Sequence, residues 1–324
     1  MRRAPRWSIA IIWSCCDGRR VTSTFALTGG TGFVGTHVIE QAMAQGLALR
    51  VLTRRPQPDR PNVTWIEGAL DRPASLAALV RGADAVIHVA GVINAVDRAG
   101  FEQGNVAGTA AVVDAARDAG VRRFVHVSSL AAREPGLSEY GASKLRSEDV
   151  VRASPLDWTI VRPPAVYGPH DREILELFRM ARWRLMPLPP GGRLSVIAAE
   201  DLARLLLALA RDGSAGGTTY EPDDGVPGGW DQRTFARAIG AAIDRRVVPL
   251  PIPEAILHIG ARADRLVRGS SAKLTPDRVR YFSHPDWAVS ATAQPPATLW
   301  RPEVPTPAGL RATAAWYRKA GLLK

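Results

Sequence analysis

A glycine-rich turn between a short apolar run and an amphipathic stretch is the feature that most constrains the fold of this chain. The apolar run ends at Leu27, and the turn continues through residues 28–35. Glycine at such positions permits a tight turn, a close approach of backbone N–H groups to a pyrophosphate, and close packing of helix on strand. The spacing predicts a dinucleotide at the positive end of a helix over 33–45. The residues expected to hold it are Gly29, Thr31, Gly32, Phe33, Val34 and Gly35.

The residues after the second predicted strand, 48–53, indicate which dinucleotide is bound. An NAD site would place Asp or Glu here to hold the ribose 2′-hydroxyl. This chain has Arg54 and Arg55 instead, and no acid before Asp59. Two guanidinium groups could bind a 2′-phosphate, although both could also be ordinary solvated charges. We therefore expect NADP(H) to be favoured, with NAD(H) possible.

Length and charge limit the class of protein. The 324 residues provide room for one large domain and a smaller one. The net charge of +11 could attract nucleic acid or acidic lipid, but it comes from arginines scattered along the chain. We therefore expect a small-molecule substrate, no nucleic-acid partner and no firm membrane signal. No run reaches the ~18 apolar residues of a membrane span, and the apolar run 205–210 is expected to be a buried helix face.

The first twenty residues differ from the rest of the chain. They hold both cysteines, Cys15 and Cys16, and their apolar run is shorter than the ~7–15 residues of a secretory signal core. We expect a disordered extension over 1–20, a native start near Val21 and a cytoplasmic protein. The folded body then has no cysteine for disulfides or thiolate metal sites. The six histidines show no metal-ligand spacing, so no metal is expected; two of them, in predicted strands, are expected at the edge of the core.

Strand and helix signals alternate through residues 21–169. Apolar runs without alternation are typical of strands buried on both faces. Strands separated by helices predict a doubly wound parallel sheet of the Rossmann type, an α/β fold that forms an NAD(P)-binding domain. The strands are expected at 24–28, 48–53, 63–67, 84–90, 123–128 and 157–162, and the helices at 33–45, 73–81, 101–119 and 140–153.

Residues 170–324 are expected to form a smaller mixed α/β substrate lobe over the carboxyl ends of the strands. The helix that begins near Asp201 should return to the sheet, and the last helix should have Thr306 as its N-cap. The amphipathic helix 253–268 is expected to pack on this lobe, with a membrane-surface role as the alternative. Helices are predicted at 172–183, 200–211, 231–243, 253–267 and 307–320.

Tyr140 and Lys144 carry the catalytic signal. They lie four residues apart at the start of the helix that follows the fifth strand, so both side chains share one helix face. The ammonium group should lower the pKa of the phenol towards neutrality, which would let Tyr140 exchange a proton with a hydroxyl or carbonyl. Either Ser128 or Ser129, at the end of the strand, could hold the substrate oxygen.

These motifs resemble the short-chain dehydrogenase/reductase superfamily in its extended, NAD-dependent epimerase/dehydratase-like branch, over roughly residues 22–210. The resemblance implies a triad of Ser129 (or Ser128), Tyr140 and Lys144, with Lys144 also holding the cofactor ribose. It also implies cofactor contacts from residues that follow the strands or lie on the predicted helix 101–119. These residues are Asp71, Ala90, Gly91, Asn105, Ser128, Pro163 and Val166.

The loop between serine and tyrosine departs from the pattern of sugar-nucleotide epimerases. Only Leu130 to Glu139 separate Ser129 from Tyr140, which resembles the atypical members, including the NADPH-binding accessory subunit of respiratory complex I. We therefore expect an NAD(P)(H)-dependent oxidoreductase that interconverts a hydroxyl and a carbonyl on a small organic substrate. The alternatives are a nucleotide-sugar epimerase or dehydratase with tightly bound NAD, and a catalytically idle NADPH-binding scaffold.

A homodimer is possible through the helices 101–119 and 140–153, which often form the interface in the extended branch. Apolar and small residues in the first helix, among them Val106, Ala110 and Val113, exceed what one buried stripe requires. A two-fold axis there would give an isologous four-helix interface.

Overall fold

The computed structural model describes residues 23–189, 191–213, 216–269 and 276–323. The extension expected over 1–20, with both cysteines, lies outside these residues. Within the described part of the chain, no helix is both long enough and apolar enough to cross a membrane.

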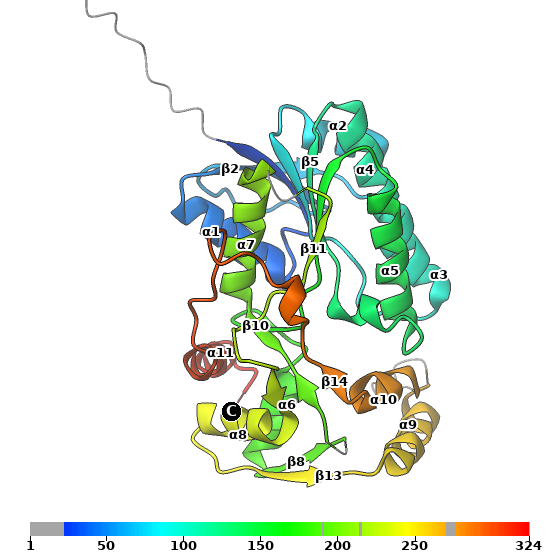
Figure 1. The fold of residues 1–324 in the computed structure, drawn as a ribbon, viewed down its shortest axis with the longest axis vertical. Helices are drawn as coiled ribbons and strands as arrows, with labels where there is room; N and C mark the ends of the chain where they lie inside the picture. Colours follow the sequence, from blue (N-terminus) through cyan, green and yellow to red (C-terminus); the bar gives the residue numbers. More distant parts are fainter. Residues whose placement is uncertain (1–22, 190, 214–215, 270–275, 324) are drawn as a thin grey trace, which may run out of the picture.

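A seven-stranded parallel sheet forms the upper part of the molecule (Figure 1). Its strand order, β11-β6-β5-β4-β1-β2-β3, confirms the doubly wound Rossmann-type fold. Six strands lie where the sequence predicts them; the seventh, β11, was not predicted because its three residues carry no pattern of their own. The strands are β1 Thr24–Thr28, β2 Ala48–Thr53, β3 Val63–Glu67, β4 Ala85–His88, β5 Arg123–Val127, β6 Asp157–Val161 and β11 Thr218–Tyr220.

Helices cover both faces of this sheet (Figure 1). On one face, α1 and α7 pack against each other, and α7 also contacts β4 and β5. The apolar run 205–210 lies in α7 and is almost entirely buried, as predicted. The helices of the other face pack on a second apolar cluster. The helix bounds are α1 Phe33–Ala44, α7 Ala199–Arg211, α2 Pro73–Val80, α4 Gly108–Asp118 and α5 Glu139–Arg152.

The helix predicted over 101–119 is not uniform. A short helix, α3 (Arg98–Phe101), leads into a π-helical turn, η1 (Glu102–Ala107), before α4 begins. A π-turn widens the helix locally and occurs frequently at functional sites. Asn105 is the buried residue of this turn, so the departure from regular helix falls on a predicted site residue.

The lower lobe contains small sheets and helices around its own apolar cluster. In its two-stranded sheets, β7 pairs with β10 and β8 pairs with β13; β12, β9 and β14 form a third sheet. One of its helices, α10, was not predicted. The bounds are β7 Ala165–Tyr167, β8 Leu185–Leu188, β9 Arg193–Leu194, β10 Val196–Ala198, β12 Trp230–Asp231, β13 Val248–Pro251, β14 Asp286–Trp287, α6 Leu175–Arg182, α8 Gln232–Ala242, α9 Glu254–Arg268, α10 Pro276–Ser283 and α11 Thr306–Lys319.

The start of α11 differs from the prediction that Thr306 caps it. Pro305 occupies the N-cap position, and Thr306 is the first helical residue. The hydroxyl of Thr306 donates to the Asp224 carboxylate at 2.5 Å, so it is engaged away from the helix backbone. Asp201 accepts hydrogen bonds from the backbone N–H groups of Glu303 and Val304, which fixes the segment before α11 to the start of α7.

Candidate active site

The glycine turn has the close approaches that its sequence predicts. Gly29 has φ +74°, and a Cβ there would lie 2.7 Å from the backbone nitrogen of Ala90. A Cβ on Gly35 would collide with the carbonyl oxygen of Gly29, so α1 can only begin this close to β1 with glycine. Gly32 is the N-cap of α1 and offers no side chain to the first turn. These backbone N–H groups are therefore free of a capping side chain and fit a pyrophosphate.

Arg54 and Arg55 are exposed at the end of β2, the position expected to contact the ribose. The hydroxyl of Thr53 donates to the carbonyl oxygen of Arg55 at 2.7 Å, which fixes the turn after the strand. Over the described residues, neither arginine forms an ion pair within 4.0 Å. Both guanidinium groups are therefore accessible to an external anion. Asp71 is also exposed, in the turn before α2.

Tyr140 and Ser129 are brought together at the carboxyl end of β5. Ser138 caps α5 by accepting from the backbone N–H of Gly141 at 3.1 Å, which places Tyr140 in the first turn. The hydroxyl of Ser129 lies close enough to the phenol of Tyr140 to affect its pKa. Burial raises the pKa of Tyr140, while the neighbouring hydroxyl of Ser129 opposes this rise. The expected lowering of this pKa by Lys144 is therefore wrong: the pKa is raised, and the phenol is protonated at neutral pH.

Lys144 lies one turn further along α5, with a buried side chain. Its Nζ donates to the carbonyl oxygen of Val127 at 2.9 Å. Burial lowers the pKa of Lys144 to about 8, and the nearby carboxylate of Glu148 opposes the decrease. A Cβ on Gly91 would lie 3.7 Å from Nζ, so the backbone after β4 passes directly by the ammonium group.

Ser128 and Ser129 differ in their partners, which distinguishes the two residues that the sequence left open. Ser128 donates to the buried carboxylate of Glu148 at 2.5 Å. Arg162 holds the same carboxylate with two hydrogen bonds, of 2.8 and 2.7 Å, and Arg152 adds one of 2.6 Å. The side chain of Ser128 therefore belongs to a buried ion-pair network, and Ser129 is the serine at the tyrosine.

Asn105 connects three segments of the site. Its amide oxygen accepts from the backbone N–H of Val92 at 2.6 Å, and its amide nitrogen donates to the carbonyl oxygen of Val92 and the hydroxyl of Ser143. These bonds hold the loop after β4, which includes Gly91, against α5. Asn105 therefore positions the loop that was expected to line the cofactor.

Two buried histidines lie below the site. His88 is hydrogen-bonded to the hydroxyls of Thr28 and Thr109, and its ring stacks on that of His126 with centroids 5.4 Å apart. Burial, together with the charge of Lys144, lowers the pKa of His88 to about 3 and that of His126 well below its usual value. Both rings are neutral and lie inside the core, so the expected position at its edge is wrong.

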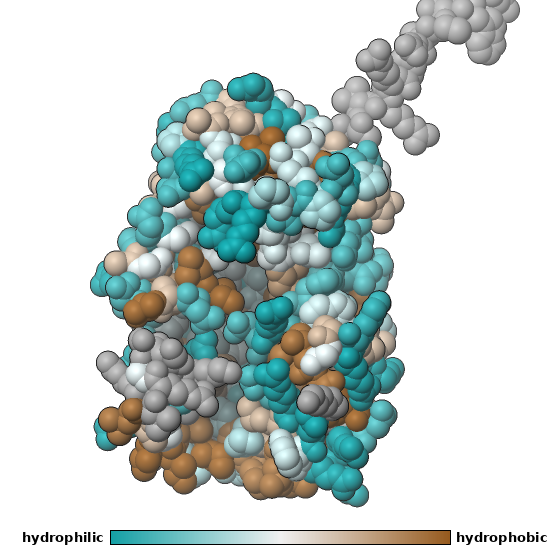
Figure 2. Space-filling view, turned by 180° about the vertical axis from the view of Figure 1, so that it is seen from behind, coloured by the Kyte–Doolittle hydropathy of each residue, from teal (hydrophilic) through white to brown (hydrophobic). Residues whose placement is uncertain are grey.

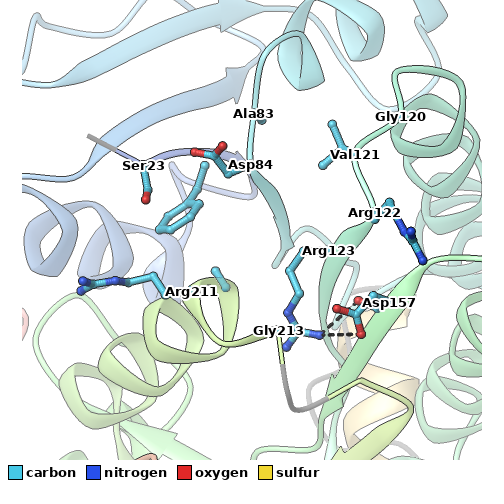
Figure 3. A pocket seen from close by; sticks show the side chains of 12 residues that line it. Ser23, Ala83, Asp84, Gly120, Val121, Arg122, Arg123, Asp157, Arg211 and Gly213 are labelled. Carbon is cyan, nitrogen blue, oxygen red and sulfur yellow. Dashed lines mark hydrogen bonds and ion pairs between the residues drawn. The ribbon is translucent and has the colours of Figure 1, made fainter. Parts of the chain in front are cut away.

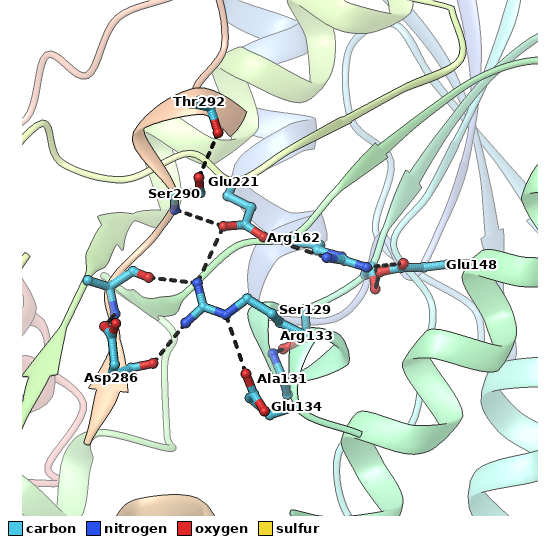
Figure 4. Close-up of polar contacts among 12 residues, drawn as sticks. Ser129, Ala131, Arg133, Glu134, Glu148, Arg162, Glu221, Asp286, Ser290 and Thr292 are labelled. Atoms are coloured by element: carbon cyan, nitrogen blue, oxygen red, sulfur yellow. Dashed lines mark hydrogen bonds and ion pairs between the residues drawn. The ribbon is translucent and has the colours of Figure 1, made fainter. Parts of the chain in front are cut away.

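A chain of ion pairs joins the site to the lower lobe (Figure 4). Glu221 lies 3.6 Å from Arg162 and 3.7 Å from Arg133. Arg133 donates to the carbonyl oxygens of Ala288 and Asp286, both at 2.8 Å. Because Arg133 belongs to the short loop between Ser129 and Tyr140, these contacts fix that loop against β14.

The remaining predicted cofactor residues lie at the same edge of the sheet. Ala90 donates its backbone N–H to the Thr28 hydroxyl at 3.2 Å, and Pro163 accepts from the backbone N–H of Leu130 at 2.9 Å. Val166, in β7, packs partly buried against the core of the sheet. Ala90, Pro163 and Val166 therefore border the glycine turn, Ser129 and Tyr140. The face of the molecule shown in Figure 2 is hollowed between the two lobes.

A separate hollow of about 930 Å³ lies at the opposite edge of the sheet (Figure 3). Its lining includes Asp84, Arg122 and Asp157, which stand at the amino ends of β4, β5 and β6. Arg123, also in its lining, is already bonded to the carbonyl oxygen of Leu209 and to the carbonyl oxygen of Asp157. None of the predicted site residues lines this hollow, and it lies at the other end of the strands.

Sequence reasoning missed three contributors to the site. Glu148 follows Lys144 by four residues, so the helical spacing that identified Tyr140 and Lys144 could also have found it. Glu221 and Tyr281 come from distant parts of the chain, and no local pattern marks them. Tyr281, on α10, is close enough that the charge of Tyr140 contributes to raising its pKa, after burial.

The model of a family described as NAD(P)H-binding matches residues 29–212. A ceramide reductase of Caulobacter vibrioides is 40% identical over 316 residues, covering 92% of this chain and 95% of that protein. A farnesyl-dihydroquinoline-oxide ketoreductase of Stigmatella aurantiaca is 27% identical over 72% of this chain and 78% of its own length. The structure of a UDP-N-acetylglucosamine 4-epimerase from Bacillus cereus, 18% identical, superposes over 92% of this chain and 97% of its own with a TM-score of 0.68.

Proposed function

Because the chain belongs to the NAD(P)H-binding short-chain dehydrogenases/reductases of the extended branch, we propose that it reduces a ketone to a secondary alcohol with NADPH. The observation that supports the proposal most is the placement of Tyr140 beside Ser129, with the buried Lys144 one turn further along α5, since a reduction needs a positioned proton donor at the carbonyl oxygen. The similarity to a ceramide reductase over nearly the whole chain supports a ceramide-type lipid ketone as the substrate.

Each residue has a distinct role in this proposal. The first turn of α1 would hold the pyrophosphate, and Arg54 with Arg55 the 2′-phosphate. Bound NADPH would supply the hydride for the carbonyl carbon. Ser129 orients the carbonyl oxygen, and Tyr140 donates its proton to that oxygen. The ammonium of Lys144 holds the ribose and favours the tyrosinate that remains after proton transfer.

The direct test is NADPH oxidation in the presence of a detergent-solubilised ceramide-type ketone. We expect oxidation that depends on the lipid and yields the corresponding alcohol. A nucleotide-sugar epimerase would instead convert a UDP-sugar without net consumption of cofactor. NADPH binding without turnover of either substrate would favour the idle scaffold.

A cytoplasmic location also remains a prediction.

The cofactor preference follows from Arg54 and Arg55. Charge-assisted hydrogen bonds to a 2′-phosphate should make NADPH bind more tightly than NADH by about 1–3 kcal/mol. Calorimetric titration of both cofactors checks this value. Replacing both arginines by Ala should remove the difference, whereas Arg72→Ala, at an exposed arginine before α2, should leave it. Equal dissociation constants in the unmutated protein would refute the preference.

The pH dependence follows from Lys144, whose pKa of about 8 lies below that of a free lysine. The ammonium form is needed, and it is lost as the pH rises through this value. We therefore expect kcat/KM, which reports ionisations of the free enzyme, to fall above pH 8. Lys144→Arg should lose this decrease along with part of its activity, because a guanidinium does not deprotonate. An unchanged decrease in the variant would assign it to another group.

We also propose the dimer through the helices 101–119 and 140–153, with a corrected set of contact residues. Val113 is 6% exposed and packs in the chain's own core, so it is not available to a partner. Val106 and Ala110 are half-buried and remain accessible. Ala110→Arg should convert a dimer to a monomer in light scattering, while Arg211→Glu, exposed at the end of α7 on the other face of the sheet, should not. A monomeric unmutated protein at micromolar concentration would rule the dimer out.

A further inference from the structure

The lower end of the C-terminal lobe presents an apolar surface, which we call the basal surface. Its apolar residues come from β8 and the short segment between α6 and β8, from β13, and from α9. These elements lie together at this end of the molecule (Figure 1). The space-filling view shows apolar residues gathered along the same end (Figure 2). They are Trp183, Leu185, Val248, Leu250, Ile256, Ile259 and Leu266.

The helix α9 is oriented with an apolar stripe facing solvent. Ile256, Ile259, Ala263 and Leu266 follow the 3.6-residue repeat along one face, and all four are exposed. Leu266 is 88% exposed and Ile259 64%. The opposite face of α9 carries the buried Ala261. The expectation that this helix packs its apolar side on the lobe is therefore only half correct, because a second apolar side is left uncovered.

The rest of the basal surface combines apolar and basic side chains. Leu185 and Val248 are paired across β8 and β13, and each is about half exposed. Trp183 is 79% exposed. Among the side chains described over 182–188 and 244–268, the acids are Asp244 and Asp264. The exposed arginines of the same segments are Arg182, Arg184, Arg245, Arg246 and Arg262.

We propose that the basal surface docks on an anionic lipid bilayer, with α9 lying in the plane of the interface. A helix with an apolar stripe flanked by arginine is typical of interfacial helices, and Trp is enriched at the same depth. The arginines complement anionic headgroups. A second copy of this chain fits less well, because an isologous contact would bring the same arginines against one another.

The basal surface is connected to the candidate active site through α10. This helix packs on α9, and its Arg278 contacts the side chain of Asn94 in the loop after β4. Tyr281 of α10 lies near Tyr140. Docking through α9 thus places a bilayer one helix away from the reacting groups. The docking itself does not depend on the proposed function. Only its purpose rests on that function, because a lipid ketone would enter the site from the bilayer.

Vesicle flotation tests the docking without any substrate. The protein should float with phosphatidylcholine vesicles that contain phosphatidylglycerol, and more weakly with phosphatidylcholine alone. Leu266→Glu and Arg262→Glu should each lower the partition coefficient by about tenfold or more. Leu266→Met keeps the apolar surface, and Arg81→Glu makes the same charge change at the end of α2; both should float like the unmutated protein. Because Leu266 is exposed, its replacement removes no core contact.

Three results would overturn the docking: no flotation with anionic vesicles, unchanged flotation of both Glu variants, or a dimer that Leu266→Glu dissociates while no vesicle binding occurs. Activity on the detergent-solubilised lipid ketone separates this inference from the proposed function. Flotation without that activity would refute the proposed function alone. Activity without flotation would refute the docking alone, and Leu266→Glu should retain the detergent activity of the unmutated protein.

Discussion

Replacing Tyr140 by Phe should lower kcat by about 10²–10⁴-fold, which is the usual contribution of a positioned general acid. The substitution removes the hydroxyl that would protonate the substrate oxygen and keeps the ring, which lies 6.3 Å from that of Phe101. NADPH affinity should stay nearly unchanged, because the hydroxyl serves the reacting oxygen. Steady-state rates and calorimetric cofactor binding, measured on the same preparation, check both parts.

Tyr281→Phe is the matched control. It removes a phenol hydroxyl from a residue that lies near Tyr140 in space, and it leaves the proposed proton donor unchanged. It should retain most of the activity. If Tyr140→Phe turns over the substrate as fast as the unmutated enzyme, Tyr140 is not the acid. If Tyr281→Phe is the inactive variant, the proton donor is on α10.

Replacing Glu148 by Ala should lower the free energy of unfolding by about 3–5 kcal/mol, the cost of leaving a buried ionic partner uncompensated. The carboxylate is fully buried and accepts hydrogen bonds from Ser128, Arg152 and Arg162. Its removal leaves Arg162, 15% exposed in its side chain, with the more distant Glu221 as its remaining acidic partner among the described residues. Equilibrium unfolding in denaturant measures the change.

Asp149→Ala is the control for this loss. Asp149 is the next residue of α5 and also pairs with Arg152, but its side chain is 64% exposed. Exposed ion pairs contribute little, so the change should be within about 1 kcal/mol. A loss for Glu148→Ala no larger than that of Asp149→Ala would show that the buried network does not stabilise the contact between α5 and the end of β6.

Much of the upper lobe follows from local patterns. Strands buried on both faces have continuous apolar sequences, and the glycines of the turn are required by close backbone approaches at Gly29 and Gly35. The pair Tyr140 and Lys144 could be found because helical spacing is visible in sequence. The π-turn at Asn105 could not, because it depends on hydrogen bonds with Val92 and Ser143, which come from other elements.

The lower lobe and the electrostatics were harder to predict. Strands of two or three residues, such as β11, owe their existence to a neighbour in the sheet rather than to their own sequence. The direction of the pKa change at Tyr140 depends on burial and on the reach of Lys144 to Val127, neither of which spacing reveals. The exposed side of α9 was ambiguous for the same reason, since periodicity shows a stripe but not what covers it.

The central claim is tested most directly by following the hydride. The protein would be incubated with NADPH deuterated at C4 of the nicotinamide, in separate experiments for each face, together with a ceramide-type ketone. We predict an alcohol that carries one deuterium at the carbinol carbon from one of the two labelled cofactors, and no such product from Tyr140→Phe. An unlabelled lipid with undiminished NADPH would contradict the account.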